Sequence, residues 1–380
     1  MIRVVILGST GSIGCATLSV LKRHKDRFRV VGLCAYRSVA HIAVQVAEHE
    51  VSKAVVVDPE ALQKFDDLPH ADWRSGLDEV LELVTDPEVD VVVNAIVGSV
   101  GLEATLATLK AGKRLALANK ESLVAGGPLV MEAVRQGGGE LIPVDSEHSA
   151  ILQCLEGYNV SSVGRLVLTA SGGPFQRFSK EDMKQVKPSQ ALCHPTWDMG
   201  AKITIDSSTL ANKALEVIEA HFLYEIEYNN IEVVVHPQSI VHSFVEFTDG
   251  SVLAQLGFPN MELPILYALS HPERIEDDFL RTFDPVQSDP LTFEELDRNK
   301  FPLFALGIEA GVLGGTVPTV YNAANEVAVN SFLSEKIGFL EMPEVVAHAM
   351  DIVPRRNVEV VNDVLDADKE ARIAANNFLS

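Results

Sequence analysis

The sequence has few cysteines, little positive charge and no long apolar run, and each shortage narrows the class of protein. Its 380 residues contain four cysteines, Cys15, Cys34, Cys154 and Cys193, and none of them forms a CxxC pair. We therefore expect free thiols in a reducing compartment rather than a disulfide framework. A zinc site that uses Cys193 with His194 is the alternative, which the cysteine spacing disfavours.

The formal net charge of −22 argues against nucleic acid or an anionic membrane as a partner. No apolar run has the length of a transmembrane helix. The N-terminus begins directly with a strand-like segment and shows no signal or transit peptide, which predicts a bacterial-type cytoplasm or a mature chain that has lost its targeting segment. The length predicts two or three domains.

A glycine-rich loop lies near the N-terminus, between an expected strand and an expected helix. Residues 2–7 are apolar, the loop is GSTGSIG at 8–14, and residues 15–22 have a helical pattern. In dinucleotide-binding folds such a loop lets the backbone approach the pyrophosphate, which faces the helix N-terminus. The GxxGxxG spacing is one residue longer than the common GxGxxG, so a plain strand-to-helix turn is the alternative.

The second expected strand, at residues 28–35, ends in Tyr36, Arg37 and Ser38. An NAD site usually has a carboxylate here, which binds the ribose hydroxyls and would repel the extra phosphate of NADP. Arg37 would attract that phosphate, so we expect NADP(H) as the cofactor. The alternative is that Arg37 is an exposed loop residue.

Strands and helices then alternate, as in a parallel sheet wound on both faces. We expect strands at 53–57, 91–96 and 114–118, and helices at 102–109 and 127–135. Lys120 follows one strand directly, so it should lie at the same edge of the sheet as Asp145. Lys120 and Glu121 could equally be solvated residues at a helix start.

Asp145 and Glu147 follow an apolar strand at residues 141–144. Alternate residues of an extended chain point the same way, so both carboxylates should project together where a strand ends, a common place for a cleft. Hard oxygen ligands suit Mg²⁺ or Mn²⁺. The alternative is an acidic helix start, in which Asp145 or Ser146 caps a helix that extends to residue 155.

The pattern changes after a strand at 165–170. The sequence SGGPF at 171–175 opens a long polar segment that extends to HPTWDMG at 194–200. Long loops in compact domains are often lids, and Trp197 beside His194 suits a lid that closes over a ligand. Trp197 could also be an ordinary core residue.

Residues 203–209 lead into an expected helix at 210–223, which Ser207 or Ser208 could cap. The polar residues that lie together on one side of this helix are Asn212, Lys213 and Glu216. An amide, an ammonium and a carboxylate beside a serine-rich segment predict an anion site next to a metal ligand. The alternative is a solvated helix face.

The rest of the chain is expected to form a second sheet and a helical end. Strands at 231–235, 239–248 and 251–257, with a tight turn at Asp249-Gly250, indicate a partly antiparallel sheet. Its edge could bind a second copy of the chain or simply be protected. We interpret residues 271–297 as a linker. Residues from 301 onward are interpreted as helices, including YNAANEVAVN at 321–330.

A series of motifs occurs in an order that resembles one enzyme family. They are GSTGSIG at 8–14, ANKESLV at 118–124, PVDSEHSA at 143–150, TASGGPF at 169–175, HPTWDMG at 194–200, DSST-x-x-NK-x-x-E at 206–216, HPQSIVHS at 236–243 and NAANEVAV at 322–329. Over almost the whole chain they resemble the 1-deoxy-D-xylulose 5-phosphate reductoisomerase family. The resemblance implies an NADPH- and divalent-metal-dependent oxidoreductase acting on a CH–OH group. Such an enzyme converts 1-deoxy-D-xylulose 5-phosphate to 2-C-methyl-D-erythritol 4-phosphate in non-mevalonate isoprenoid biosynthesis.

The resemblance also implies an α/β homodimer. It would have an N-terminal Rossmann-like doubly wound parallel sheet, a central α+β catalytic domain and a C-terminal helical bundle. The expected boundaries are 1–146 for the NADPH-binding domain, 147–270 for the catalytic domain, 271–297 for the linker and 298–380 for the helical domain. The catalytic domain would contain a lid at about 172–199 and the dimerisation sheet.

Site residues follow by motif position. The implied metal ligands are Asp145, Glu147 and Glu216, for Mg²⁺ or Mn²⁺ and also Co²⁺. The implied substrate-binding residues are Lys120, Ser146 and Glu147 at the reacting end, and Ser171, His194, Trp197, Ser207, Asn212, Lys213 and Glu216 elsewhere. The implied NADPH-binding residues are Gly8, Thr10, Gly11, Ser12, Ile13, Tyr36, Arg37, Ser38, Asn119, Glu121 and Gly200. Tyr36 and Ser38 depart from the family, which often has a small residue and an asparagine there.

The implied reaction is a rearrangement by retro-aldol cleavage and re-addition, followed by hydride transfer from NADPH. The metal would polarise the substrate carbonyl, and Lys120, assisted by Glu147, would move a proton or stabilise charge. Two competing interpretations are another NADP-dependent two-domain dehydrogenase of a semialdehyde or sugar phosphate, and an NADPH-sensing protein without chemistry. Neither explains the three separated acids and the phosphate-side cluster.

Overall fold

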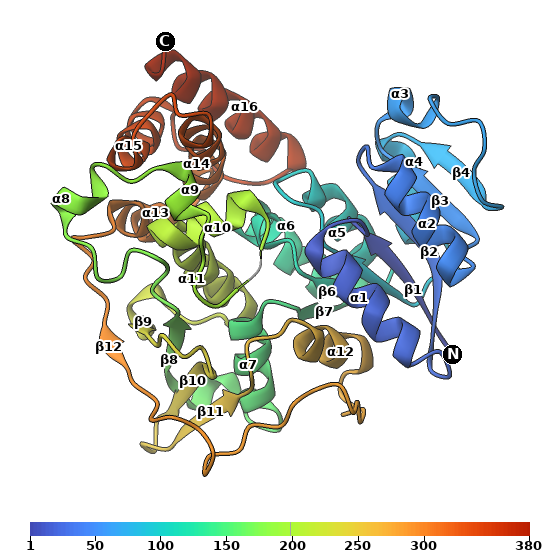
Figure 1. Ribbon diagram of the computed structural model, residues 1–380, viewed down its shortest axis with the longest axis horizontal. Coiled ribbons are helices and arrows are strands. Elements are labelled where there is room, and N and C mark those ends of the chain that lie inside the picture. Colours follow the sequence, from blue (N-terminus) through green and yellow to red (C-terminus); the bar gives the residue numbers. More distant parts are fainter. Residues whose placement is uncertain (198) are drawn as a thin grey trace. The chain divides into compact units, whose positions relative to one another are not determined.

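The computed structural model describes residues 1–197 and 199–380, which form two compact units (Figure 1). The first unit contains Met1–Ser122, Val130–Ser149 and Asn260–Leu280. The second contains Leu123–Leu129, Ala150–Pro259 and Arg281–Ser380. Asp198, which falls in the segment interpreted as a lid, lies outside the described residues.

The first unit is built on a parallel sheet with the strand order β4-β3-β2-β1-β5-β6-β7. Its strands are β1 (Ile2–Leu7), β2 (Phe28–Ala35), β3 (Lys53–Val56), β4 (Asp72–Ser75), β5 (Val91–Asn94), β6 (Arg114–Leu117) and β7 (Glu140–Pro143). Residues Val4 to Leu7 of β1 are fully buried, as expected for a parallel strand covered on both faces. The strand order reverses between β1 and β5, which is where open α/β sheets bind ligands. The predicted fold class is thereby confirmed.

Helices connect these strands. They are α1 (Ser12–Arg23), α2 (Val39–His49), α3 (Pro59–Leu62), α4 (Leu77–Thr85), α5 (Gly101–Lys110) and α6 (Lys120–Gly137), with α12 (Glu262–Ser270) added from later in the chain. Sequence reasoning did not anticipate β4 or α2 to α4. Helix α12 packs against α1, β6 and β7, so residues just before the expected linker belong to the first unit.

The second unit contains a mixed sheet with the order β11-β10-β8-β9-β12. Its strands are β8 (Val163–Ala170), β9 (Ile231–Val235), β10 (Val241–Phe247), β11 (Val252–Leu256) and β12 (Glu294–Glu295). Strands β8 and β9 pair in parallel, and the other pairs are antiparallel. The predicted second, partly antiparallel sheet is confirmed, and Gly250, at φ +88°, takes the left-handed conformation at the predicted hairpin turn.

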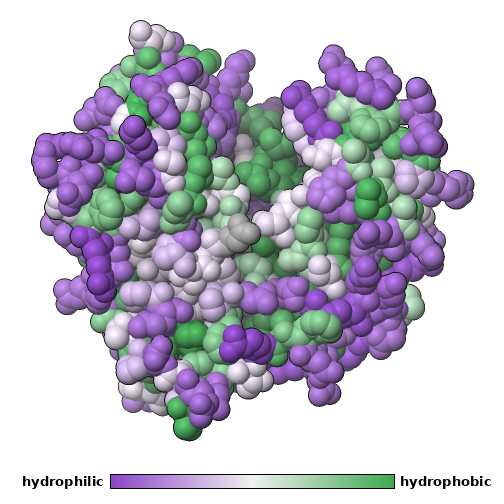
Figure 2. Space-filling view, viewed as in Figure 1, coloured by the Kyte–Doolittle hydropathy of each residue, from purple (hydrophilic) through white to green (hydrophobic). Residues whose placement is uncertain are grey.

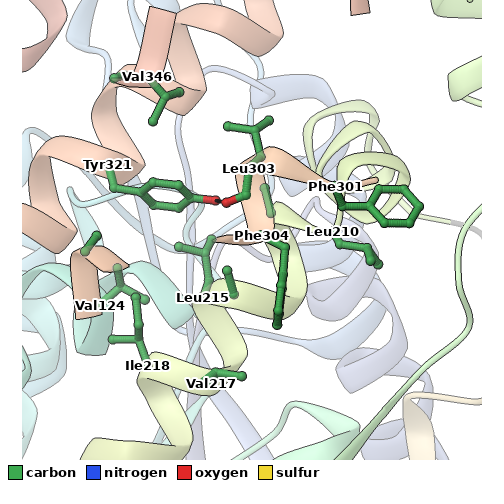
Figure 3. Packing of buried hydrophobic residues seen from close by; sticks show 14 of the residues in the cluster. Val124, Leu210, Leu215, Val217, Ile218, Phe301, Leu303, Phe304, Tyr321 and Val346 are labelled. Atoms are coloured by element: carbon green, nitrogen blue, oxygen red, sulfur yellow. Dashed lines mark hydrogen bonds between the residues drawn. The ribbon is translucent and has the colours of Figure 1, made fainter. Parts of the chain in front are cut away.

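Helices surround a single apolar cluster in the second unit. They are α7 (Ser146–Leu155, which starts in the first unit), α8 (Lys180–Met183), α9 (Pro188–Ala191), α10 (Ala201–Thr209), α11 (Ala211–Tyr224), α13 (Pro302–Leu313), α14 (Val317–Leu333), α15 (Met342–Ile352) and α16 (Val361–Phe378), with short 3₁₀ turns at Val160–Ser162, Tyr228–Asn230 and Phe339–Glu341. Figure 3 shows that α11, α13 and α14 pack together through Leu215, Phe304 and Tyr321. The Tyr321 hydroxyl donates a hydrogen bond to the Leu303 carbonyl oxygen at 2.9 Å. Leu215 is fully buried, so Leu215→Ala should cost about 2–5 kcal/mol. The helical C-terminal end is as predicted.

Two local predictions were wrong. Residues 203–209 were expected to lead into a helix that Ser207 or Ser208 caps, but both serines lie inside α10, and the next helix begins after Leu210. Leu210 is buried with φ +60°, a conformation that leucine rarely adopts.

Glu147 does not extend a strand, because β7 ends at Pro143 and α7 starts at Ser146. The alternative of an acidic helix start is therefore the observed local structure, with Asp145 just before α7 and Glu147 in its first turn.

Hydrophilic side chains dominate the surface over α8 and over α3 and β4 (Figure 2), in keeping with the net charge of −22. Within the described ranges, no helix combines the length and the apolar character needed to cross a membrane. All four cysteines are free thiols, as predicted, and burial raises the pKa of Cys34 to about 12.

Candidate active site

The glycine loop has the geometry of a phosphate-binding turn. Gly8 follows β1 with φ +77°, and a Cβ added there would lie 2.5 Å from the Ala95 carbonyl oxygen. A Cβ on Gly14 would lie 2.4 Å from the Gly8 oxygen, so α1 can start this close to the strand only with glycine. Gly11, the N-cap of α1, provides no side-chain cap, and it is exposed, as is Ser12. The helix N-terminus is thus open to an anion.

Arg37 lies directly after β2 and is held by two neighbours. Its guanidinium lies over the Tyr36 ring at 4.8 Å, and its Nε donates to Asp58 Oδ2 at 2.5 Å. The hydrogen bond with Asp58 raises the pKa of Arg37 and lowers the pKa of Asp58. Because the bond uses Nε, the terminal nitrogens of the guanidinium can face a phosphate. Sequence reasoning missed Asp58, and its position at the end of the next strand was the only available signal.

Asn119 organises the ends of β5 and β6. Its side chain is buried, its Nδ2 donates to the carbonyl oxygens of Ile96 and Gly98 at 2.6 and 2.9 Å, and its Oδ1 caps α6 by accepting from Ser122 N. Nδ2 also lies 2.8 Å from Glu121 Oε2. These contacts fix the loop after β5, which adjoins the glycine loop at the switch point.

Lys120 and Asp145 form an ion pair at the carboxyl edge of the first sheet. Lys120 Nζ lies 2.7 Å from Asp145 Oδ2, and the lysine side chain is only 7% exposed. Ser146 Oγ donates to Glu147 Oε2 at 2.6 Å, and the buried His148 lies at the edge of ion-pair distance from Asp145, at 4.0 Å. The prediction that Lys120 and Asp145 share one edge of the sheet is confirmed. Carboxylates held beside an ammonium are donors that suit a hard divalent cation.

Ser171, His194 and Trp197 are linked in the second unit. His194 Nδ1 accepts from the backbone N–H groups of Thr196 and Trp197 at 3.1 and 2.9 Å, so the proton of the neutral ring is on Nε2. Nε2 lies 3.0 Å from Ser171 Oγ and can donate to it, which leaves the hydroxyl hydrogen of Ser171 for a ligand. Burial lowers the pKa of His194 and favours this neutral form. The Trp197 ring lies 6.5 Å from that of His242.

The first turns of α11 carry the predicted polar cluster. Asn212 Nδ2 donates to Glu216 Oε1 at 2.5 Å, and Lys213 Nζ forms an ion pair with Glu216 Oε2. Lys213 and Glu216 are 4% and 1% exposed, so this is a buried charge pair and not a solvated helix face. Removing two charges from water costs free energy that can exceed their mutual attraction, so the pair is weak evidence for a stabilising role. Buried charges of this kind are common at functional sites, which favours a role in ligand binding. Ser207 is half-buried on α10, and Gly200 is the N-cap of that helix.

The zinc alternative finds no support. Cys193 Sγ donates to the Ser189 carbonyl oxygen at 3.2 Å, and both His194 nitrogens are engaged. In the part of the chain that the structure describes, no cysteine belongs to a cluster of metal-ligating side chains.

These features define the class of protein. A parallel sheet with a glycine loop at its switch point and an arginine after β2 is a Rossmann-type domain for an NADP-like dinucleotide. The second unit adds buried polar groups suited to an anionic substrate, as in a two-domain oxidoreductase.

Comparison with known proteins identifies the family. Family profiles described as 1-deoxy-D-xylulose 5-phosphate reductoisomerase and as its C-terminal domains match residues 4–127, 141–224 and 256–374. The chain is 50% identical to 1-deoxy-D-xylulose 5-phosphate reductoisomerase of Chlorobium chlorochromatii, over 98% of each chain. It is 41% identical to the Zymomonas mobilis enzyme in complex with NADPH, with a TM-score of 0.91, covering 100% of this chain and 99% of the other. A structure of the enzyme with NADPH, fosmidomycin and magnesium gives 38% identity and a TM-score of 0.94, covering 100% and 98%. The chain belongs to the 1-deoxy-D-xylulose 5-phosphate reductoisomerase family, as its motifs predicted.

Proposed function

We propose that this chain converts 1-deoxy-D-xylulose 5-phosphate to 2-C-methyl-D-erythritol 4-phosphate with NADPH and a divalent cation. The observation that carries the proposal is the pair of buried lysine–carboxylate contacts, Lys120–Asp145 and Lys213–Glu216, at the positions of the family motifs. A plain dinucleotide-binding protein has no use for both. The relatives with solved structures bind NADPH and magnesium, which supports the choice of both cofactors.

Asp145, Glu147 and Glu216 are the proposed ligands of Mg²⁺ or Mn²⁺. Each offers carboxylate oxygens, the donor type that these cations prefer, and Asp145 and Glu216 already lie beside an ammonium group that can neutralise them when no cation is bound. When bound, the cation would act as a Lewis acid on the substrate's carbonyl and hydroxyl oxygens.

Lys120 is the proposed proton-transfer or charge-stabilising group. Its side chain is nearly buried, so its ammonium would act in a site of low dielectric constant, where its interactions with developing negative charge are strong. Glu147 accepts from Ser146 and would assist by orienting that hydroxyl toward the substrate.

The phosphate of the substrate would be bound in the second unit. The proposed contacts are Ser171, His194, Ser207, Asn212 and Lys213, with Trp197 covering the ligand and residues 172–199 acting as the lid. The support is chemical. Ser171 can donate its hydroxyl hydrogen. Asn212 and Lys213, which follow Ser207 in the same motif, supply an amide donor and a cation.

NADPH would bind along the glycine loop, with Thr10 to Ile13 and Gly8 near the pyrophosphate and Arg37 near the 2′-phosphate. Tyr36, Ser38, Asn119, Glu121 and Gly200 complete the proposed contacts. Bound NADPH supplies the hydride, and the protein positions it.

The test is an assay of NADPH absorbance with 1-deoxy-D-xylulose 5-phosphate, with and without Mg²⁺. The proposal requires turnover that depends on both. Exhaustive dialysis against EDTA should abolish activity, and Mg²⁺ or Mn²⁺ should restore it. NADPH binding without oxidation by this substrate would favour a sensing protein or a different dehydrogenase.

We also propose a homodimer. Strand β11 is an edge strand that exposes the apolar residues Val252, Leu253 and Leu256 at 53%, 37% and 38%, and a second copy could cover them. Leu253→Lys should then shift the sedimentation coefficient toward that of a monomer. The bacterial relatives support a cytoplasmic location.

The domain boundaries near residues 147 and 298 belong to the same proposal. The boundary at 271 does not, because Asn260–Leu280 belong to the first compact unit.

A further inference from the structure

We propose that Asn325, in the C-terminal helix α14, is a positioning residue for the phosphate side of the site. It would act by holding Asp206 of α10, the residue before Ser207. The inference rests on the proposed function and assigns a role to the C-terminal motif NAANEVAV at 322–329.

The contact between the two helices is direct and buried. Asn325 Nδ2 donates to Asp206 Oδ1 at 2.7 Å across 119 residues of sequence, and both side chains are fully buried. Lys202 Nζ lies 2.9 Å from the other oxygen, Asp206 Oδ2. Asp206 is therefore bound on both oxygens, by its own helix and by α14, while Ser207 beside it remains half-buried.

Helix α10 needs such support. It has 9 residues, its N-cap Gly200 makes no side-chain capping bond, and it contains the β-branched run Ile203, Thr204 and Ile205. Short helices with these features are marginal by themselves, so tertiary contacts must fix their position.

A change in the position of α10 should also move α11, the helix that follows it. Leu210 joins α10 to α11 through a single residue with φ +60°, and its side chain is buried. A buried residue in this conformation leaves little freedom between the helices. A shift of α10 would therefore move Asn212 and Lys213 along with Ser207.

An asparagine at position 325 would destabilise the fold if its role were only to pack against its neighbours. Its Oδ1 is buried with no hydrogen-bond partner among the described residues. A buried acceptor without a donor is destabilising, and a leucine of similar size would avoid that cost. Within residues 1–197 and 199–380, the group that explains the amide is Asp206, to which Nδ2 donates.

The first test compares Asn325→Leu with Asn322→Leu. Asn322 is a matched control, because it lies one turn earlier on α14, is equally buried and also has an unpartnered Oδ1, but donates to Glu326 and not to α10. Asn325→Leu should raise KM for 1-deoxy-D-xylulose 5-phosphate and Kd for inorganic phosphate by about 10- to 100-fold, the scale of a misplacement of about 1 Å. Equal KM and phosphate Kd in the two variants would overturn the inference.

The second test covers the case in which Asn325→Leu fails to fold. Asn325→Asp should weaken phosphate binding, because it places two carboxylates against each other, and adding Asp206→Asn restores an amide–carboxylate pair with the roles reversed. Recovery of phosphate affinity in the double variant supports the positioning role, and no recovery contradicts it. Calorimetry with inorganic phosphate needs no turnover, so this result is independent of whether the unmodified chain acts on 1-deoxy-D-xylulose 5-phosphate.

Discussion

Replacement of Lys213 by methionine should make the stability of the second unit depend on a divalent cation. The Lys213 and Glu216 side chains are 5% and 2% exposed and lie one turn apart on α11. Methionine retains most of the packing but removes the ammonium, and breaking a buried ion pair in this way costs about 3–5 kcal/mol. Asn212 still donates to Glu216, so we expect the lower end of that range. At about 2–4 °C per kcal/mol, the midpoint of thermal unfolding in EDTA should fall by roughly 6–12 °C.

Mg²⁺ should reverse part of this loss. At about 100 times its dissociation constant, a cation that binds only the folded state adds about 2.7 kcal/mol. The increase in the free energy of unfolding on adding Mg²⁺ should be larger in Lys213→Met than in the unmodified chain, because Glu216 no longer has an ammonium beside it. Lys202→Met is the matched control: it removes a similar cation from the buried Asp206, which is not a proposed ligand, so Mg²⁺ should give it no extra stability. The reasoning fails if Lys213→Met and the unmodified chain unfold at the same temperature in EDTA, or if Mg²⁺ stabilises both equally.

Three further predictions concern Lys120, Arg37 and His194. Lys120→Ala should lower kcat by about 10²–10⁴-fold, and near-normal turnover would remove Lys120 from the mechanism. Arg37→Ala should raise KM for NADPH with little change in kcat, an expectation that fails if NADH serves the unmodified chain equally well. For His194, burial lowers the folded-state pKa, so between that value and about 6.5 the unfolded chain binds more protons. The His194 contribution to the unfolding free energy is therefore complete above about pH 6.5 and is lost as pH falls. Denaturant unfolding of His194→Asn, whose amide oxygen can replace Nδ1 as acceptor, should depend less on pH in this range; an unchanged pH dependence would contradict the assignment.

The parts of the fold that local patterns encode could be predicted from sequence. The glycine loop, the apolar parallel strands and the Asp249-Gly250 turn each restrict the backbone within a few residues, and the ordered motifs identified the family. Helix α10 could not be predicted in this way. Its β-branched residues favour a strand locally, and the hydrogen bond that holds its Asp206 comes from α14, more than a hundred residues later.

The same distinction separates which site residues were found from which were missed. Lys120, Asp145, Lys213 and Glu216 were found because they lie in motifs that resemble the family, whereas their local patterns alone fitted a helix start or a solvated face equally well. Asp58 and Asn325 were not, because an aspartate before a proline and an asparagine in a helix are ordinary in sequence, and only their partners, Arg37 and Asp206, give them a role. A residue that binds a ligand carries its chemistry in its own side chain. A residue that positions another is recognisable only by what it touches, so the supporting part of an active site is where coordinates add most to a sequence.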